Sequence, residues 1–146
     1  MARRKKHEAE CTPAPLSLVC LHGTFSGNGD PNRAIVTLNI NGKHETGQAV
    51  GSGPIEACFN AIQDMVPHSA RLAAYRVEAL SEGANAKGGA NVTLKYQGGG
   101  DFDGFGADAN ILVASVQAYL QALNKLRSFE VKRAGSRFGS TVASNL

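Results

Sequence analysis

The sequence predicts an α+β fold made of two β-β-β-α units, each a small antiparallel sheet with one helix packed on it. Two observations predict this fold. Strand-like alternation and helix-like spacing follow one another twice along the chain, in the same order. The two halves also contain similar sequence segments, since "VTLNINGK" at 36–43 resembles "VTLKYQGG" at 92–99. Two helix-like runs align as well when Ala57 is matched with Ala114. Such self-similarity indicates a duplicated unit.

The first unit is predicted to span residues 16–66. "LSLVCLHGTFSG" is rich in strand-forming residues and stops at the turn cluster "GNGDPN". "RAIVTLNI" alternates with period two, the pair Asn41–Gly42 predicts a tight hairpin turn, and "KHETGQAV" is its returning partner. Apolar residues at three- and four-residue spacing then predict a helix from Pro54 to about Met65.

The second unit is predicted to span residues 71–126. "RLAAYRVEAL" and "ANVTLKYQ" are expected to be strands, and "DFDGFGA" a short strand or loop, with glycine-rich turns between them. A helix is expected from about Asn110 to Leu126. A three-stranded sheet with one helix has a thin core, so a second copy of the chain is expected to cover the remaining apolar faces in a homodimer.

Composition and charge indicate one globular domain with basic ends. The chain has 146 residues, of which 42% are hydrophobic and 18% charged. Basic residues gather at 3–6 and 132–137, whereas the middle of the chain is mildly acidic. Residues 1–15 are therefore expected to be a linker or the remnant of an upstream subdomain, and residues 127–146 a basic C-terminal tail. A folded body that binds nucleic acid is not expected, because its positive charge would lie on a folded face.

Cysteine usage and hydropathy predict a cytoplasmic protein. The three cysteines, Cys11, Cys20 and Cys58, form no CxxC pair, and their odd number favours a reduced chain. No apolar run is long enough to span a membrane, and the charged N-terminus lacks the apolar region of a signal peptide. No membrane association is expected.

No catalytic site, metal site or cofactor site is expected. The four histidines lie apart, without the spacing of metal ligands. Cys58 lies on the apolar stripe of the first helix, which favours a buried, inert thiol. The segment "GGGDFDGFG" has many glycines, but it lacks the Lys-Ser/Thr pair of a phosphate-binding loop.

The segment "AVGSGPIEACFNAI" at 49–62 predicts a small anion site. Pro54 suits the first position of a helix, and Gly51 and Gly53 allow the backbone to approach a ligand closely. Helix amides without a side-chain cap, at the positive end of the helix dipole, bind anions. Asp108, near the start of the second helix, is a candidate partner for an ammonium group. The two sites together suit a zwitterionic amino acid, but the residues alone favour a simple tight strand-to-helix turn.

Three motifs in order resemble the C-terminal regulatory (LeuA dimerisation) domain of 2-isopropylmalate synthases and citramalate synthases, over about residues 16–126. The first is a Gly-x-Gly-Pro-hydrophobic-x-Ala helix start, the second a Tyr-x-x-x-Ala-x-x-x-Gly-x-x-Ala stretch, and the third an Ala-Ser-x-x-Ala-Tyr-x-x-Ala-Leu-Asn ending. The matching residues are Gly51, Gly53, Pro54, Ile55 and Ala57; Tyr75, Ala79, Gly83 and Ala86; and Ala114, Ser115, Ala118, Tyr119, Ala122, Leu123 and Asn124.

The resemblance implies an intertwined homodimer and feedback inhibition by leucine bound near the dimer interface. Carried over by position, it implies an effector site formed by Gly53, Pro54, Ile55, Leu72, Tyr75, Ala79, Asn85, Ala86 and Gly88. Two residues depart from the family pattern. Glu56 stands where a small residue or Asp is common, and Asn85 where an acid is frequent, so either is expected to weaken or retune effector binding.

The resemblance also implies that the chain does not catalyse a reaction by itself. The parent synthases condense acetyl-CoA with a 2-oxo acid on a metal-bearing TIM barrel, and no such barrel is encoded here, so the catalytic partner is expected in cis or in trans. Three alternatives stay open: an isoleucine-sensing domain of citramalate synthase, a structural dimerisation module without an effector, and a small nucleic-acid binder with basic tails.

Overall fold

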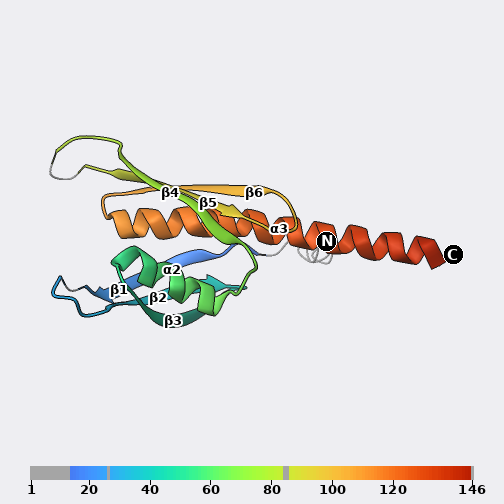
Figure 1. Ribbon diagram of the computed structural model, residues 1–146, viewed down its shortest axis with the longest axis horizontal. Coiled ribbons are helices and arrows are strands. Elements are labelled where there is room, and N and C mark those ends of the chain that lie inside the picture. Colours follow the sequence, from blue (N-terminus) through green and yellow to red (C-terminus); the bar gives the residue numbers. More distant parts are fainter. Residues whose placement is uncertain (1–13, 26, 84–85, 146) are drawn as a thin grey trace.

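The computed structural model describes residues 14–25, 27–83 and 86–145, with side chains up to residue 133. It confirms the duplicated α+β architecture, with two β-β-β-α units in sequence (Figure 1). The two sheets form the outer layers, and the two helices lie between them. The elements are β1 (Ser17–Thr24), β2 (Asn32–Ile40), β3 (Lys43–Gly51), α2 (Pro54–Met65), β4 (Arg71–Ala79), β5 (Gly88–Lys95), β6 (Asp101–Asp108) and α3 (Ile111–Asn145).

Both sheets are antiparallel, in the orders β1-β2-β3 and β4-β5-β6. The predicted hairpin between β2 and β3 is confirmed. Asn41 and Gly42 both have positive φ, 55° and 83°, as a type I′ turn requires. The edge strands β1 and β4 each carry a register shift near their start, at Leu18/Cys20 and at Leu72/Ala74. The duplication therefore extends to this irregularity.

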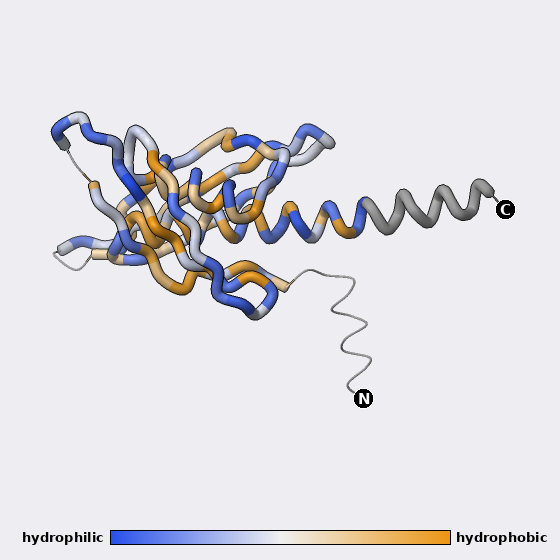
Figure 2. The backbone as a smooth tube through the Cα atoms, turned by 90° about the horizontal axis from the view of Figure 1, so that it is seen from below, coloured by the Kyte–Doolittle hydropathy of each residue, from blue (hydrophilic) through white to orange (hydrophobic). Residues whose placement is uncertain are grey.

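One continuous hydrophobic core joins the two units. The middle strands β2 and β5 turn alternate residues inward, and both helices pack on these faces. Figure 2 shows the hydrophobic stretches concentrated in the body of the molecule, while the hairpin tips are hydrophilic. The largest fully buried side chains include Leu38, Ile62, Leu94, Leu123 and Leu126. Burial of each such side chain stabilises the fold by roughly 1.5–3 kcal/mol.

The segment 101–107, predicted as a short strand or loop, forms nearly all of the complete strand β6. Two glycines in this strand let α3 lie directly on it. A Cβ atom at Gly104 would collide with the carbonyl oxygen of Ala118, and one at Gly106 with that of Ala114. The glycines that favoured a loop in the sequence thus serve a close strand–helix contact.

Helix α3 continues past its predicted end near Leu126, and it projects from the body (Figure 1). The first turns of this extension pack on the β5–β6 hairpin. Phe129 contacts the rings of Tyr96 and Phe102, with centroids 5.9 and 5.4 Å apart, and Arg133 donates a hydrogen bond to the carbonyl of Gly98. These contacts with the β5–β6 hairpin therefore stabilise the part of α3 that follows Leu126.

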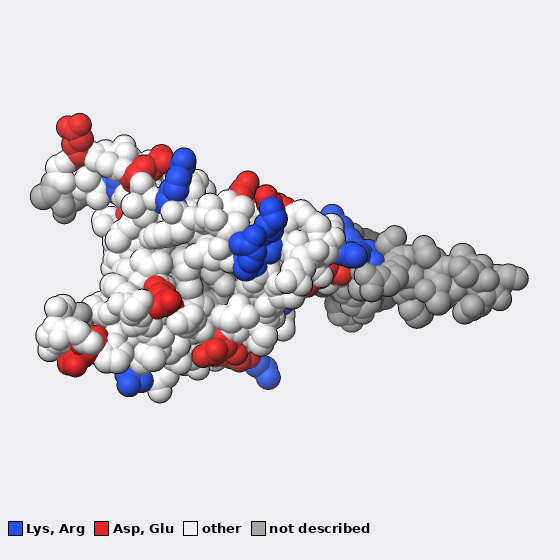
Figure 3. All heavy atoms as spheres, viewed as in Figure 1, with Lys and Arg blue, Asp and Glu red and all other residues white. Residues whose placement is uncertain are grey.

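Charged side chains of both signs lie scattered over the face of the body seen in Figure 3, without a continuous basic area. This distribution does not favour a nucleic-acid interface on that face. Among the described residues, no helix has the length and hydropathy needed to cross a membrane.

Candidate functional site

The site that best fits a small ligand is a hollow of about 470 Å³ between α2 and β4. The hollow exists because the edge strand of one unit packs on the helix of the other unit only in one of the two possible places. The edge strand of the first unit, β1, packs on α3, whereas β4 and α2 make few direct contacts. The hollow is lined by Ile55, Glu56, Phe59, Asn60 and Gln63 of α2, by Ala70, Leu72 and Tyr75 in and just before β4, and by Tyr119 of α3.

A β-bulge places two residues of β4 on the same wall of the hollow. Leu72 and Tyr75 are three positions apart and would point to opposite faces of a regular strand. The register shift between Leu72 and Ala74 inserts one residue, so Leu72 pairs with Leu94 and Tyr75 with Val92. Both partners are completely buried, which shows that Leu72 and Tyr75 share the inner face of the sheet.

Three aromatic rings form the back of the hollow. Phe59 lies edge-on to Tyr75, with centroids 5.8 Å apart, and tilted against Tyr119 at 4.5 Å. The hydroxyl of Tyr75 lies 2.6 Å from Ser115 Oγ, and Ser115 donates its own proton to the carbonyl of Ile111. Tyr75 is therefore the donor to Ser115, and this bond fixes the orientation of its ring.

His68 closes the end of the hollow near the connection between α2 and β4. Its Nδ1 accepts a hydrogen bond from the Ala70 amide at 3.2 Å, so the neutral ring carries its proton on Nε2 and donates it to Tyr119 Oη at 2.8 Å. Burial lowers the pKa of His68 below its usual 6.5, against the opposing charge of Glu130. Burial also raises the pKa of Tyr119 to about 12. Both groups are thus neutral at neutral pH.

The start of α2 forms the other end of the hollow. Gly53 is the N-cap in extended conformation, with φ −143° and no side-chain cap, and Pro54 begins the helix. The first helical hydrogen bond runs from Ala57 N to Gly53 O, so the described residues offer no acceptor to the amides of Ile55 and Glu56. These two N–H groups are available to a ligand.

Glu56 reaches back from the first turn to Ser52. Its Oε1 accepts hydrogen bonds from Ser52 N at 2.6 Å and Ser52 Oγ at 2.7 Å. The Ser52 backbone bond, followed by the side-chain bond, holds the pKa of Glu56 below its usual 4.5. The hollow therefore has one ionised carboxylate at its edge.

The predicted site residues fall into three groups. Ile55, Leu72 and Tyr75 line the hollow, and Gly53 and Pro54 form the helix start directly before it. At Gly51, a Cβ atom would lie 2.6 Å from Ala57 N, so this glycine allows β3 to end against α2. The remaining members lie elsewhere: Ala79, Gly88 and Asp108 pair in one cross-strand row at the end of the second sheet, Ala86 lies in the β4–β5 loop, and Asn85 is outside the described residues.

Asp108 does not line the hollow. Its Oδ2 accepts a hydrogen bond from Asn110 N at 2.8 Å, and Asn110 Oδ1 in turn accepts one from Leu112 N. Asn110 thus caps the start of α3. The start of α2 has no such cap, which leaves the two helix starts chemically different.

Sequence reasoning missed six residues of the hollow as members of the site: Glu56, Phe59, Asn60, Gln63, Ala70 and Tyr119. Four of them lie on α2, at helical spacing from Ile55 and Glu56, and a helical projection of this segment contains that signal. Tyr119 belongs to the third motif, but nothing local in the sequence shows that it reaches the first helix. The predicted buried thiol at Cys58 is confirmed, and burial raises its pKa to about 11.

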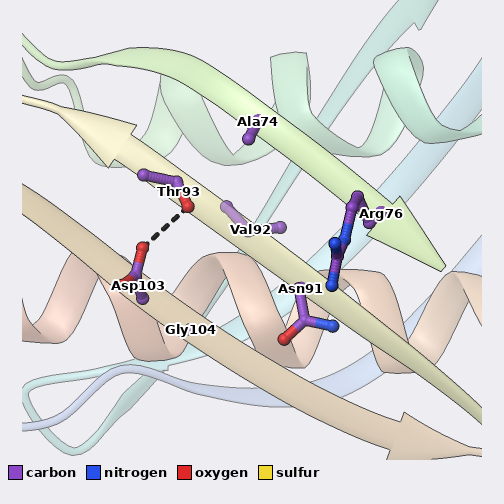
Figure 4. A pocket seen from close by; sticks show the side chains of 7 residues that line it. All are labelled: Ala74, Arg76, Asn91, Val92, Thr93, Asp103 and Gly104. Carbon is purple, nitrogen blue, oxygen red and sulfur yellow. Dashed lines mark hydrogen bonds between the residues drawn. The ribbon is translucent and has the colours of Figure 1, made fainter. Parts of the chain in front are cut away.

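A second hollow, of about 340 Å³, lies on the outer face of the second sheet (Figure 4). Arg76 extends beside Asn91 there, and Thr93 donates a hydrogen bond to Asp103 at 2.7 Å. No helix in the described part of the chain covers this face, and its polar side chains are those of a solvent-facing antiparallel sheet. Within the part of the chain that the structure describes, no group of three His, Cys, Asp or Glu residues is placed to hold a metal ion.

Comparison with known proteins identifies the family of the chain. Residues 7–127 match the family described as the LeuA allosteric (dimerisation) domain, which covers most of the chain. The chain belongs to this family. The resemblance inferred from the three motifs is therefore confirmed.

Three relatives of the LeuA-domain chain share 40–46% of its residues over the matched region. A 2-isopropylmalate synthase of Methylobacterium nodulans is 46% identical over 111 residues, which is 76% of this chain and 20% of the relative. Those of Methylorubrum populi and Rhodopseudomonas palustris (strain TIE-1) are 43% and 40% identical, over 74% and 76% of this chain and 21% and 20% of theirs. The chain thus spans about a fifth of the length of these synthases.

Proposed function

We propose that the chain is the effector-binding regulatory domain of a 2-isopropylmalate synthase and that it binds leucine in the hollow between α2 and β4. One observation supports this most strongly. This chain belongs to the LeuA family, and its apolar hollow lies directly beside two helix-start amides that have no partner among the described residues. An apolar cavity with a few convergent polar groups is the usual form of a small-molecule site.

The chemistry of the hollow suits an amino acid with a branched apolar side chain. The amides of Ile55 and Glu56, at the positive end of the helix dipole, are suitable donors to an α-carboxylate. The isobutyl group then lies against Ile55, Phe59 and Leu72, which form an apolar wall. The hollow of about 470 Å³ has ample room for such a ligand.

A regulatory role follows if leucine prefers one geometry of the domain. The relatives are named 2-isopropylmalate synthase, an acyltransferase activity, so feedback inhibition by leucine is the proposed output. The catalytic barrel is a partner in cis or in trans, and a cytoplasmic location stays a prediction. Ligand binding biases the attached enzyme only through a difference in affinity between two states.

We further propose that two chains form a homodimer through the uncovered part of the second sheet. Edge strand β4 exposes Leu72 by 43% and Val77 by 53%, and Leu80, just after the strand, by 43%. An apolar edge strand of this kind needs cover. Sedimentation equilibrium is expected to give twice the mass of one chain. A monomer at micromolar concentration, with and without leucine, would contradict the proposal.

Calorimetric titration with leucine and isoleucine tests the effector. We expect saturable heat with leucine and binding of isoleucine weaker by about fivefold to hundredfold, because a pocket of methyl groups separates such isomers by only about 1–3 kcal/mol. Tighter binding of isoleucine would assign the domain to the citramalate-synthase type. Absence of heat with both amino acids would leave only the dimerisation role.

A further inference from the structure

Two side-chain amides of α2 line the hollow, and each donates one hydrogen bond within the protein. Asn60 Nδ2 donates to the carbonyl of Val50 at 3.0 Å, and Gln63 Nε2 donates to the carbonyl of His68 at 3.1 Å. Because both partners are carbonyls, which only accept, the orientation of both amides is fixed. Asn60 Oδ1 and Gln63 Oε1 remain for other partners, as does the second N–H of each amide, and no bond to either oxygen is seen among the described residues.

Glu56 adds a negative charge to these polar side chains. Glu56, Asn60 and Gln63 are spaced four and three residues apart, so they form one stripe along α2. Oε1 of Glu56 is held by Ser52, and the structure shows no bond from a described residue to Oε2. Among the described residues that line the hollow there is no lysine or arginine. The charged side chain of this wall therefore favours a cationic group, whereas the Ile55 and Glu56 amides at the helix start favour an anionic one.

We infer that Glu56 is the specificity-determining residue of the hollow, which recognises the ammonium group of the ligand and rejects branched apolar acids that lack it. The inference rests on the proposed function, since Glu56 is assigned to the ammonium group of the same amino-acid ligand. The two hydrogen bonds from Ser52 anchor the Glu56 carboxylate at the edge of the hollow. Asp108, the acid that the sequence suggested for this role, lies at the end of the second sheet, outside the lining.

The ligand class follows from charge complementarity. A zwitterion places its carboxylate on the Ile55 and Glu56 amides and its ammonium on the Glu56 carboxylate, two groups of the same helical turn. A simple carboxylate or a 2-oxo acid satisfies the amides but meets the charge of Glu56 without compensation. Because the Glu56 side chain is exposed to solvent, water weakens both effects, and we expect changes of about fivefold.

The test compares two ligands on three forms of the full chain by calorimetry. The ligands are leucine and 4-methylpentanoate, which is leucine without its amino group. The forms are the wild type, Glu56→Gln, and the control Asp64→Asn, which removes an exposed acid from the same helix outside the hollow. Thermal unfolding of each form, measured first, shows that the substitutions leave the fold intact.

We expect the wild type to bind leucine at least tenfold more tightly than 4-methylpentanoate. Glu56→Gln is expected to weaken leucine binding about fivefold and to strengthen 4-methylpentanoate binding. The ratio of the two affinities therefore falls in this variant, whereas Asp64→Asn leaves the ratio unchanged. Equal loss of both ligands in Glu56→Gln, or an unchanged preference, would overturn the role of Glu56 and leave the proposed function standing. Failure of the wild type to bind leucine at all would instead overturn the proposed function.

Discussion

Replacement of Ala70 by tryptophan is expected to abolish leucine binding without unfolding the domain. Ala70 lies just before β4 and lines the hollow beside Leu72. An indole at this position occupies the apolar part of the hollow, where the isobutyl group is proposed to lie. Since the hollow is open and Ala70 is half-buried, the indole has room, and we expect stability to change by no more than about 1 kcal/mol. The expected loss of affinity is about fiftyfold or more, measured by calorimetry.

The matched control is Ala74→Trp, on the outer face of the same strand. Ala74 pairs with Thr93 on the solvent-facing side of the sheet, away from the hollow between α2 and β4. This variant is expected to bind leucine as the wild type does. Unchanged affinity in Ala70→Trp, or an equal loss in both variants, would place the ligand somewhere else.

Replacement of Gly104 by alanine is expected to destabilise the domain by about 3 kcal/mol or more. The new Cβ atom would collide with the carbonyl oxygen of Ala118 and lie 2.7 Å from Ala122 N, both backbone atoms of α3. Helix backbone cannot move aside as a flexible side chain does, so α3 must lift off β6 and open the core beneath Leu123. Denaturant unfolding followed by circular dichroism measures the change.

Gly27→Ala serves as the control for this substitution. Among the described residues, no atom lies within 4 Å of a Cβ atom added at Gly27, and Gly27 is not one of the glycines with positive φ. Its replacement is expected to change the free energy of unfolding by less than about 0.5 kcal/mol. A Gly104→Ala variant as stable as this control would show that α3 does not rest on β6 as described.

The order of the elements was predictable from local patterns. Period-two alternation marked β2, the Asn41–Gly42 pair marked its hairpin, and apolar spacing marked α2 from Pro54 to Met65, all of which the structure confirms. Strand β6 was harder to predict, because Gly104 and Gly106 are there for α3, which follows later in the chain. The extension of α3 was missed for a similar reason, since Phe129 packs on a hairpin distant in sequence.

The site was only partly predictable, because its geometry depends on one irregular residue. Regular alternation separates Leu72 from Tyr75, and only the bulge before Ala74 brings both to the hollow. Ala79, at the other end of the same strand, pairs with Gly88 and therefore lies outside the hollow. Glu56 was recognised in the sequence as a departure from the family pattern, but its position in the hollow depends on how α2 faces β4.

The most direct test of the central claim is to observe where bound leucine lies. In isotope-filtered NMR of the full chain with leucine, we expect nuclear Overhauser effects from the leucine methyl groups to the rings of Phe59 and Tyr75 and to the methyl groups of Leu72. Contacts restricted to the end of the second sheet, near Gly88 and Asp108, would show that leucine does not bind between α2 and β4.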